Sequence, residues 1–203
     1  VSIKNFRTSK LNKYLKIEGS EIFEELKRKN EQVVFISGHF NNFELMAMEI
    51  EKSGIDVAAI YRPLNNIFLN KIMEKIRKQY ICKHQIKKGM SGAREIIKLY
   101  KDGFSMALMI DQRVREGIKL NFFGEPASTT TIPAQLVKKF GCKIVPIYIE
   151  RIDKFYYKMK INSPLNFDKN HSIENISSIL NTELEKMVLK KPSQWIWSHD
   201  RWK

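Results

Sequence analysis

The sequence contains little cysteine, few acidic residues and no long hydrophobic run. Its only cysteines are Cys82 and Cys142, which match neither a metal-binding spacing nor a disulfide framework and so favour a reducing compartment. The longest apolar run, residues 104–110, has the length of a strand and falls well short of the roughly 20 residues that a transmembrane helix needs. No signal peptide is recognisable. These shortages exclude a disulfide-stapled secreted fold and predict that no segment of this chain spans a membrane.

The shortage of acidic residues makes the chain strongly basic. The 203 residues include 36 Lys and Arg against 22 Asp and Glu, a formal net charge of +14. Such a charge favours anionic partners: nucleic acid, a phosphorylated lipid surface or an acidic protein. Part of the excess can also be a solvated lysine-rich face. Because no zinc finger, aromatic RNA-binding motif or glycine-rich phosphate loop is present, nucleic acid is the least favoured of these partners.

Apolar strands alternate with amphipathic helices along the whole chain. The predicted strands are 33–36, 57–61, 104–110, 143–149 and an edge strand at 155–161. The predicted helices are 21–29, one that begins at Asn41 or Asn42, 66–77, 91–101, one that ends at Phe140, and 173–189. Residues 113–128 are predicted to form a long charged loop. This alternation predicts an α/β fold with a mostly parallel central sheet flanked by helices, in a single domain over residues 1–203.

Polar residues follow directly after the predicted strands. His39 follows the first strand, Tyr61-Arg62 the second, Asp111 the third and Arg151 the fourth. The carboxyl ends of parallel strands lie at one edge of a sheet, where ligands of α/β proteins bind. We therefore expect these residues to lie together at one rim, as a catalytic site would require.

His39 and Glu44 form the strongest candidate pair at this rim. If His39 lies in the turn and Glu44 in the first turn of the next helix, the carboxylate can orient the imidazole, which leaves one ring nitrogen free to take a proton. Two alternatives stay open: Asn41-x-x-Glu44 also fits a capping box, and His39 could be a hydrogen-bonded turn residue. The other histidines are scattered and indicate no metal site.

An ordered series of motifs resembles the late acyltransferases of lipid A biosynthesis, the lauroyl and myristoyl transferases of the lysophospholipid acyltransferase-like group. The matching blocks are Gly38-His39-Phe40-Asn41-Asn42-Phe43-Glu44, Tyr61-Arg62-Pro63-Leu64-Asn65-Asn66, Arg77, Asp111-Gln112, Phe122-Phe123-Gly124, Thr129-Thr130-Thr131, Val145-Pro146 with Arg151, and the tail from Pro192 to Arg201. The resemblance covers the chain from about residue 15 to its end, and it implies a glycerolipid acyltransferase-like fold. Two departures are notable: the family's amino-terminal membrane anchor is absent from this chain, and Asp200 replaces a frequent arginine.

The resemblance implies transfer of a fatty acyl chain from acyl carrier protein to a hydroxyl of a lipid A precursor, with no cofactor, at the cytoplasmic face of the bacterial inner membrane. His39 is the implied general base with Glu44 as its orienting residue. Arg62, Arg77, Asp111 and Arg151 are the implied substrate-binding residues, although Arg77 and Asp111 could also pair with each other. Because no Gly-x-Ser-x-Gly elbow is present, direct transfer is favoured over an acyl-enzyme.

The basic charge fits two of the implied partners, the acidic acyl carrier protein and an anionic membrane surface. Two other functions stay open. One is an acyltransferase of the same group that acts on glycerophospholipids or glycolipids, with acyl carrier protein or coenzyme A as donor. The other is a non-catalytic basic module that binds membrane or nucleic acid.

Overall fold

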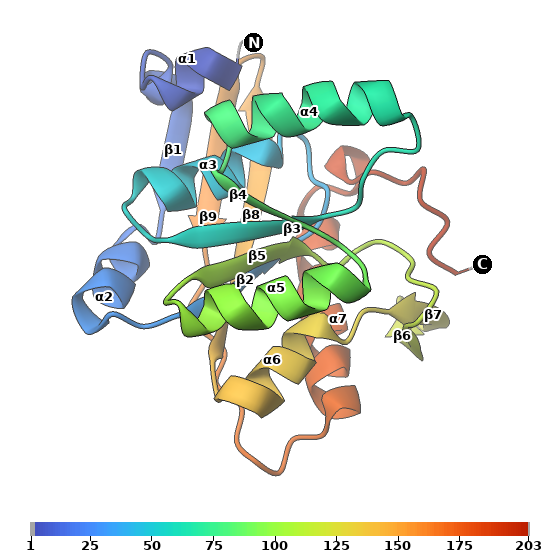
Figure 1. The fold of residues 1–203 in the computed structure, drawn as a ribbon. Helices are drawn as coiled ribbons and strands as arrows, with labels where there is room; N and C mark the ends of the chain where they lie inside the picture. Colours follow the sequence, from blue (N-terminus) through green and yellow to red (C-terminus); the bar gives the residue numbers. More distant parts are fainter. Residues whose placement is uncertain (1–2, 203) are drawn as a thin grey trace.

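A seven-stranded sheet with the order β1-β9-β8-β2-β5-β3-β4 forms the centre of the computed structural model, which describes residues 3–202 (Figure 1). Its strands are β1 (Leu15–Glu18), β2 (Val33–Ser37), β3 (Val57–Tyr61), β4 (His84–Lys87), β5 (Ser105–Met109), β8 (Lys143–Asp153) and β9 (Tyr156–Ile161). Neighbouring strands pair in parallel except β8 and β9, which are antiparallel. The predicted mostly parallel α/β fold is confirmed.

Helices flank this sheet. They are α1 (Ile3–Arg7), α2 (Glu21–Lys29), α3 (Glu44–Lys52), α4 (Ile67–Tyr80), α5 (Met90–Lys101), α6 (Ile132–Phe140) and α7 (Ile173–Lys190). In Figure 1, α3 and α4 lie above the central strands, whereas α5, α6 and α7 lie below them. Two short 3₁₀ turns, η1 (Asn12–Tyr14) and η2 (Pro192–Gln194), precede β1 and the C-terminal tail. No helix among residues 3–202 is both long enough and apolar enough to cross a bilayer.

The local sequence explains where these elements begin and end. All five residues of β2 are buried, as expected for a central parallel strand that is covered on both faces. The side chain of Asn66 accepts hydrogen bonds from the first free N–H groups of α4, and Ser172 does the same for α7. Gly141 ends α6 with φ of 66°, a left-handed conformation that glycine adopts without strain.

The structure corrects three local predictions. The predicted loop 113–128 contains an antiparallel hairpin, β6 (Ile118–Phe122) and β7 (Glu125–Thr129). The strand near residue 155 is not an edge strand, because β1 pairs with its outer side. Helix α3 begins at Glu44 rather than at Asn41 or Asn42: the backbone of Asn41 has φ of 34°, and its N–H donates to the carbonyl of Gln194 in the tail.

The register of the sheet places two of the predicted polar residues side by side. Ser37 at the end of β2 pairs with Met109 at the end of β5. His39 and Asp111 each lie two residues beyond this pair, so the parallel register brings them to the same point of the rim. The predicted meeting of these two residues at the carboxyl edge is confirmed.

Candidate active site

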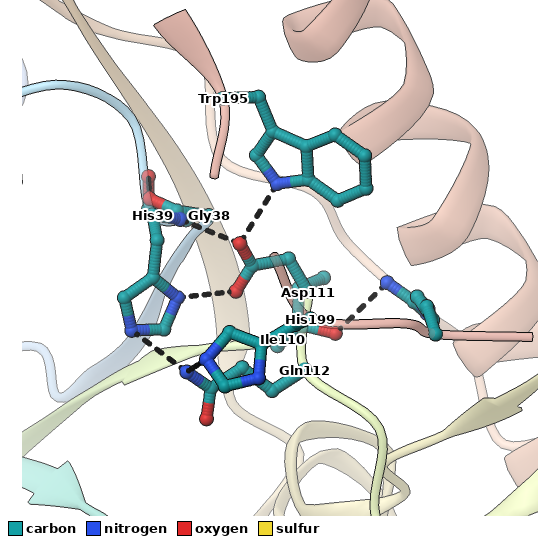
Figure 2. Close-up of polar contacts among 9 residues, drawn as sticks. Gly38, His39, Ile110, Asp111, Gln112, Trp195 and His199 are labelled. Atoms are coloured by element: carbon teal, nitrogen blue, oxygen red, sulfur yellow. Dashed lines mark hydrogen bonds and ion pairs between the residues drawn. The ribbon is translucent and has the colours of Figure 1, made fainter. Parts of the chain in front are cut away.

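His39 and Asp111 form a hydrogen-bonded pair at the carboxyl edge of the sheet. The ring Nδ1 of His39 lies 2.7 Å from Oδ1 of Asp111, and the backbone N–H of His39 donates to Oδ2 at 2.6 Å (Figure 2). The Asp111 side chain is 3% exposed and that of His39 is 16% exposed, so the imidazole alone of the two reaches solvent. An ionised carboxylate can only accept hydrogen bonds, which assigns the proton to Nδ1 and leaves Nε2 with a free lone pair. Neutral His39 is thus held in the tautomer that a general base requires.

The surroundings of Asp111 keep it ionised despite its burial. Burial by itself raises the pKa of this carboxyl, but the hydrogen bonds and charge of His39, together with the indole N–H of Trp195, outweigh burial and hold the pKa below its usual range. Trp195 donates at 2.9 Å to Oδ2, the same oxygen that accepts the backbone N–H of His39 (Figure 2). Asp111 is therefore a fixed negative charge that stabilises a positively charged imidazole.

Gly38 makes room for this arrangement. A Cβ atom at Gly38 would lie 3.2 Å from Oδ2 of Asp111 and 3.0 Å from side-chain carbons of Phe40 and Leu184. These distances are tighter than ordinary van der Waals contacts, and Phe40 and Leu184 are fully buried and packed. A side chain at Gly38 would push against both the carboxylate and the core, so glycine at this position permits the close approach of β5 to His39.

The predicted pairing of His39 with Glu44 is wrong. The carboxylate on Nδ1 is that of Asp111, and Glu44 instead accepts two hydrogen bonds from the guanidinium of Arg77, one of them from Nε at 2.8 Å. The reason is the path of the chain between them. The backbone of Asn41, whose N–H donates to Gln194 in the tail, bends and delays the helix, and the ring of Phe43 lies against the imidazole, with 4.7 Å between ring centroids. The alternative of a capping box is also wrong, because no side chain caps the start of α3. Arg77 consequently pairs with Glu44 and not with Asp111.

The second ring nitrogen of His39, Nε2, contacts Gln112, which in turn contacts His199. The side-chain amide nitrogen of Gln112 lies 3.3 Å from Nε2 of His39 and 3.0 Å from Nε2 of His199 in the C-terminal tail (Figure 2). An amide carries two N–H donors, so it can donate to both imidazoles when both are neutral. This contact is compatible with a bare Nε2 on His39 and bridges the rim of the sheet to the tail.

Arg201 supports the site from behind. Its side chain is fully buried and donates to the carbonyl of Ile110, the residue before Asp111, at 3.2 Å and to Oδ1 of Asn181 at 2.6 Å. Its guanidinium lies 4.1 Å from the centre of the Phe122 ring. Burial lowers the pKa of Arg201 to about 10, while the charge of Asp111 acts in the opposite direction. The tail thus places a cation directly behind the end of β5.

A cavity of about 400 Å³ opens beside His39. Its walls come from β2, α3, β3, α4 and β5 and are mostly apolar, including Phe35, Ile36, Phe43, Met46, Ala47, Ile50, Ile60, Met73, Ala107 and Leu108. The polar side chains at the cavity are those of His39, Glu44, Arg62, Arg77, Gln85, Lys88, Gln112 and His199, together with Tyr61, Asn65, Ser37 and Thr130. A mostly apolar cavity that also contains two imidazoles and several other polar side chains is suited to a ligand that has an alkyl chain and a polar reacting end.

The predicted arginines divide between the cavity and the outside. Arg62 and Arg77 line the cavity. Lys88 lies near Arg62, and partial loss of water around its ammonium group, followed by repulsion from Arg62, lowers the pKa of Lys88. Arg151 is exposed on β8, away from the residues that line the cavity, and its contacts to Gln194 use backbone atoms. The cavity lining therefore has positive charge from Arg62 and Lys88 as well as from Arg77.

Sequence patterns did not single out Gln112, Lys88, Trp195, His199 or Arg201 as parts of the site. The last three belong to the tail motif from Pro192 to Arg201, whose spacing of aromatic, histidine and arginine residues was the available signal. Trp195 is buried against Asp111, whereas Trp197 is half exposed and donates to the carbonyl of Pro192. In residues 3–202 no cluster of His, Cys, Asp and Glu side chains could hold a metal ion.

Comparison with known proteins connects this geometry to a family. A model of the bacterial lipid A biosynthesis acyltransferases matches residues 1–203. A lipid A biosynthesis myristoyltransferase of Escherichia coli is 22% identical over 183 residues, which is 89% of this chain and 56% of that protein. A lipid A biosynthesis acyltransferase of Haemophilus influenzae is 24% identical over 200 residues, or 96% of this chain and 62% of that protein. The chain thus spans little more than half the length of these relatives.

The fold resembles that of a solved acyltransferase. The 1-acyl-sn-glycerophosphate acyltransferase of Thermotoga maritima matches with a TM-score of 0.57 at 16% sequence identity. The match covers 95% of this chain and 79% of that protein. At this identity the likeness establishes the glycerolipid acyltransferase-like fold and nothing about substrates.

Proposed function

Because the chain belongs to the bacterial lipid A biosynthesis acyltransferase family, we propose that it transfers a fatty acyl group from acyl carrier protein to a hydroxyl of a lipid A precursor. The observation that best supports this proposal is the pair of His39 and Asp111 at the mouth of an apolar cavity. The imidazole supplies a base, and the cavity supplies space for an acyl chain. Neither a nucleic-acid-binding module nor a passive membrane module requires this combination.

His39 is the general base of the proposed reaction. Its Nε2 takes the proton of the acceptor hydroxyl as the oxygen attacks the thioester carbonyl, and a new C–O bond forms. The tetrahedral intermediate then collapses, the C–S bond breaks, and the imidazolium returns the proton to the departing thiolate. Asp111 stabilises the imidazolium between these steps. A positioned general base such as His39 typically contributes about 10²–10⁴-fold in rate. Direct transfer requires no acyl-enzyme and no cofactor.

The oxyanion of the intermediate needs a hydrogen-bond donor. The backbone N–H groups of His39, Phe40 and Asn41 are already bonded to Asp111, Gly38 and Gln194. Gln112 is the better candidate, because its amide lies against Nε2, where the acceptor hydroxyl must bind. Once the hydroxyl replaces it there, the N–H is free to donate to the oxyanion.

The cations at the cavity suit a phosphorylated acceptor. Arg62 and Lys88 lie close enough for their charges to repel, and a phosphate between them would relieve that repulsion. Arg77 is held in the cavity wall by Glu44 and can bind a polar substituent of either substrate. In this proposal Glu44 acts through Arg77 rather than through His39. Arg151 is retained only as a surface contact for an anionic partner.

The proposed partners follow from charge and family. Acyl carrier protein is acidic and the lipid A precursor is phosphorylated, which suits a chain with a formal charge of +14. The proposed place of action is the cytoplasmic face of the inner membrane, where both substrates meet.

The test is an acceptor panel with two histidine variants. Wild-type protein, His39→Ala and His171→Ala are each incubated with acyl-acyl carrier protein or acyl-coenzyme A and with lipid A precursor or lysophospholipid. We expect acylation of the lipid A precursor by wild type and His171→Ala, and a loss of about 10²–10⁴-fold in His39→Ala. Acylation of lysophospholipid alone would contradict the proposed substrate, and full activity of His39→Ala would contradict the proposed base.

A further inference from the structure

Helix α4 has the reverse of the usual amphipathic orientation. In a helix that packs on a core, the apolar face points inward and the polar face meets water. In α4, the residues that point toward the protein are mostly polar, and the large apolar side chains point away from it. In Figure 1, α4 lies along the top of the molecule, with its outer side uncovered.

The inward face of α4 is held by polar contacts. Asn70 is buried and accepts from the backbone N–H of Leu64, and its amide donates to Glu74. Glu74 also accepts from Tyr61, and this hydrogen bond, followed by those of Lys87 and Asn70, lowers the pKa of Glu74 to about 2. These bonds, with the Arg77–Glu44 pair one turn later, fix the helix in this orientation, so its outer face is not a consequence of loose packing.

The outward face of α4 combines large apolar side chains with lysines. Phe68 is 79% exposed, Ile72 57% and Leu69 55%, and Ile67 and Ile76 are also exposed. At about 100° per residue, Lys71, Lys75 and Lys78 form a stripe directly beside Phe68 and Ile72. The only acidic residue of α4 is Glu74, which points inward. We call this surface, made of Ile67, Phe68, Leu69, Ile72, Ile76 and the three lysines, the α4 face.

We propose that the α4 face is the surface with which this protein docks on an anionic lipid bilayer. The aromatic and aliphatic side chains enter the boundary between headgroups and acyl chains, and the lysines bind lipid phosphates beside them. A helix that lies in the interface with an apolar side and a lysine-rich flank has these two features. The inference rests on the proposed function, and it names the surface by which the enzyme reaches its lipid acceptor.

The position of the cavity supports a bilayer as the occupant. Leu64, three residues before α4 and bonded through its N–H to Asn70 of that helix, is 45% exposed and also lines the cavity beside His39. Met73 and Arg77 line the cavity from the inner side of the same helix. A lipid whose acyl chains stay in the bilayer can therefore reach the cavity along α4 without crossing water.

Other occupants fit the α4 face less well. A surface for an acidic carrier protein needs lysines but not a continuous patch of large apolar side chains. A second copy of the chain, with a formal charge of +14, would bring three further lysines against these three unless anions intervened. An anionic bilayer matches both features of the α4 face: its lipid phosphates match the lysines, and its acyl chains match the apolar side chains.

The first experiment measures sedimentation with vesicles of equal phosphatidylglycerol and phosphatidylcholine, and with vesicles of phosphatidylcholine alone. The variant Phe68→Ser/Ile72→Ser is compared with Ile179→Ser/Leu189→Ser, which removes two exposed apolar side chains from α7. The variant Lys71→Gln/Lys75→Gln/Lys78→Gln is compared with Lys98→Gln/Lys101→Gln/Lys169→Gln, which has the same charge. We expect both α4 variants to bind anionic vesicles more weakly, the lysine variant by on the order of 10²-fold, and both controls to bind like wild type.

A second experiment reports insertion directly. Both native cysteines are buried, so Phe68→Cys provides an accessible thiol for an environment-sensitive dye. We expect the emission of this dye to shift to the blue on addition of anionic vesicles, and that of a dye on Leu189→Cys to stay unchanged. An unchanged dye at residue 68 would contradict the proposal, whether or not the protein sediments with vesicles.

The remaining outcomes separate this inference from the proposed function. If the α4 variants bind vesicles normally but lose binding to acyl carrier protein, the α4 face binds the carrier and the proposal is wrong. If they bind vesicles normally but have a different molar mass in light scattering, the face binds a second copy of the chain and the proposal is also wrong. Acyl transfer to an acceptor dispersed in detergent should be unaffected in Phe68→Ser/Ile72→Ser. If wild-type protein binds vesicles through α4 yet transfers no acyl group, the proposed function fails while this inference stands.

Discussion

Two His–Asp pairs in this protein have nearly the same geometry and very different surroundings. Nδ1 of His39 lies 2.7 Å from Asp111, and Nδ1 of His171 lies 2.9 Å from Asp168. In each pair the backbone N–H of the histidine also donates to the aspartate, and the pKa of the aspartate is lowered. Yet the Asp111 side chain is 3% exposed and that of Asp168 63%.

The comparison shows that the contact alone does not make a catalytic pair. His171 and Asp168 are three residues apart in the loop before α7, so local chain geometry explains their contact. His39 and Asp111 are 72 residues apart and meet through the sheet, with a tryptophan donor, a buried arginine behind and a cavity in front. Low exposure to water strengthens each of these interactions. The following experiments exploit this difference.

The largest effect is expected from Asp111→Asn, compared with Asp168→Asn. Asparagine at residue 111 carries no negative charge, so it neither keeps the proton on Nδ1 of His39 nor stabilises the imidazolium. We expect kcat to fall by about 10²–10⁴-fold in Asp111→Asn and to stay at the wild-type value in Asp168→Asn. Circular dichroism is the control that tests whether both variants fold like the wild type. Equal activity of the two variants would show that the buried pair has no catalytic role.

A smaller effect, on binding rather than on rate, is expected from Arg77→Gln. Arg77 lines the cavity but is bonded to Glu44 and not to the His39 pair. We expect the KM of one substrate to rise about 10-fold, with a smaller change in kcat, and Glu44→Gln to shift the same parameter in the same direction. Steady-state kinetics with each substrate varied in turn measures both constants. A drop in kcat as large as that of Asp111→Asn would place Glu44 and Arg77 in the chemical step.

An effect on stability rather than on catalysis is expected from Trp195→Phe, which removes one donor to Asp111. Because the folded-state pKa of Asp111 is depressed, its stabilising contribution is fully present above the unfolded value of about 3.9 and is lost as pH falls from there through the lower folded-state value. Losing the indole N–H raises the folded-state pKa. We expect the free energy of unfolding to drop by about 1.5–3 kcal/mol near neutral pH and by less below pH of about 4.

The matched control is Trp197→Phe, whose indole N–H donates to a backbone carbonyl on the surface. Urea unfolding at several pH values compares the two variants. A Trp195→Phe deficit that stays constant from neutral to acidic pH would indicate lost packing rather than a lost hydrogen bond to a charge.

Much of the fold and part of the site followed from sequence patterns. The buried parts of β2, β3, β5 and β8 are mostly apolar, so the parallel sheet and its carboxyl edge were predictable. The convergence of His39, Arg62 and Asp111 followed from their positions at the strand ends. The predicted strand bounds, 33–36 and 104–110, gave these two residues unequal offsets, so their direct pairing emerged only from the register of β2 against β5.

The errors arise where distant segments decide local structure. Glu44 is five residues from His39, but a left-handed residue at Asn41, stabilised by a hydrogen bond to Gln194, turns the chain before α3 begins. A local motif cannot report a contact with a residue more than 150 positions away. The outward apolar face of α4 was likewise hidden, because the periodicity of a helix does not tell which side is buried.

The most direct test of the central claim, that Asp111 orients His39 as a base, is nitrogen NMR of the ring atoms in protein labelled at histidine. The chain has four histidines, and His39→Gln assigns the relevant signals. We predict a protonated Nδ1 and a bare Nε2 for neutral His39 in wild type and in Glu44→Gln, and loss of this single tautomer in Asp111→Asn. A single tautomer that persists in Asp111→Asn but disappears in Glu44→Gln would contradict the account.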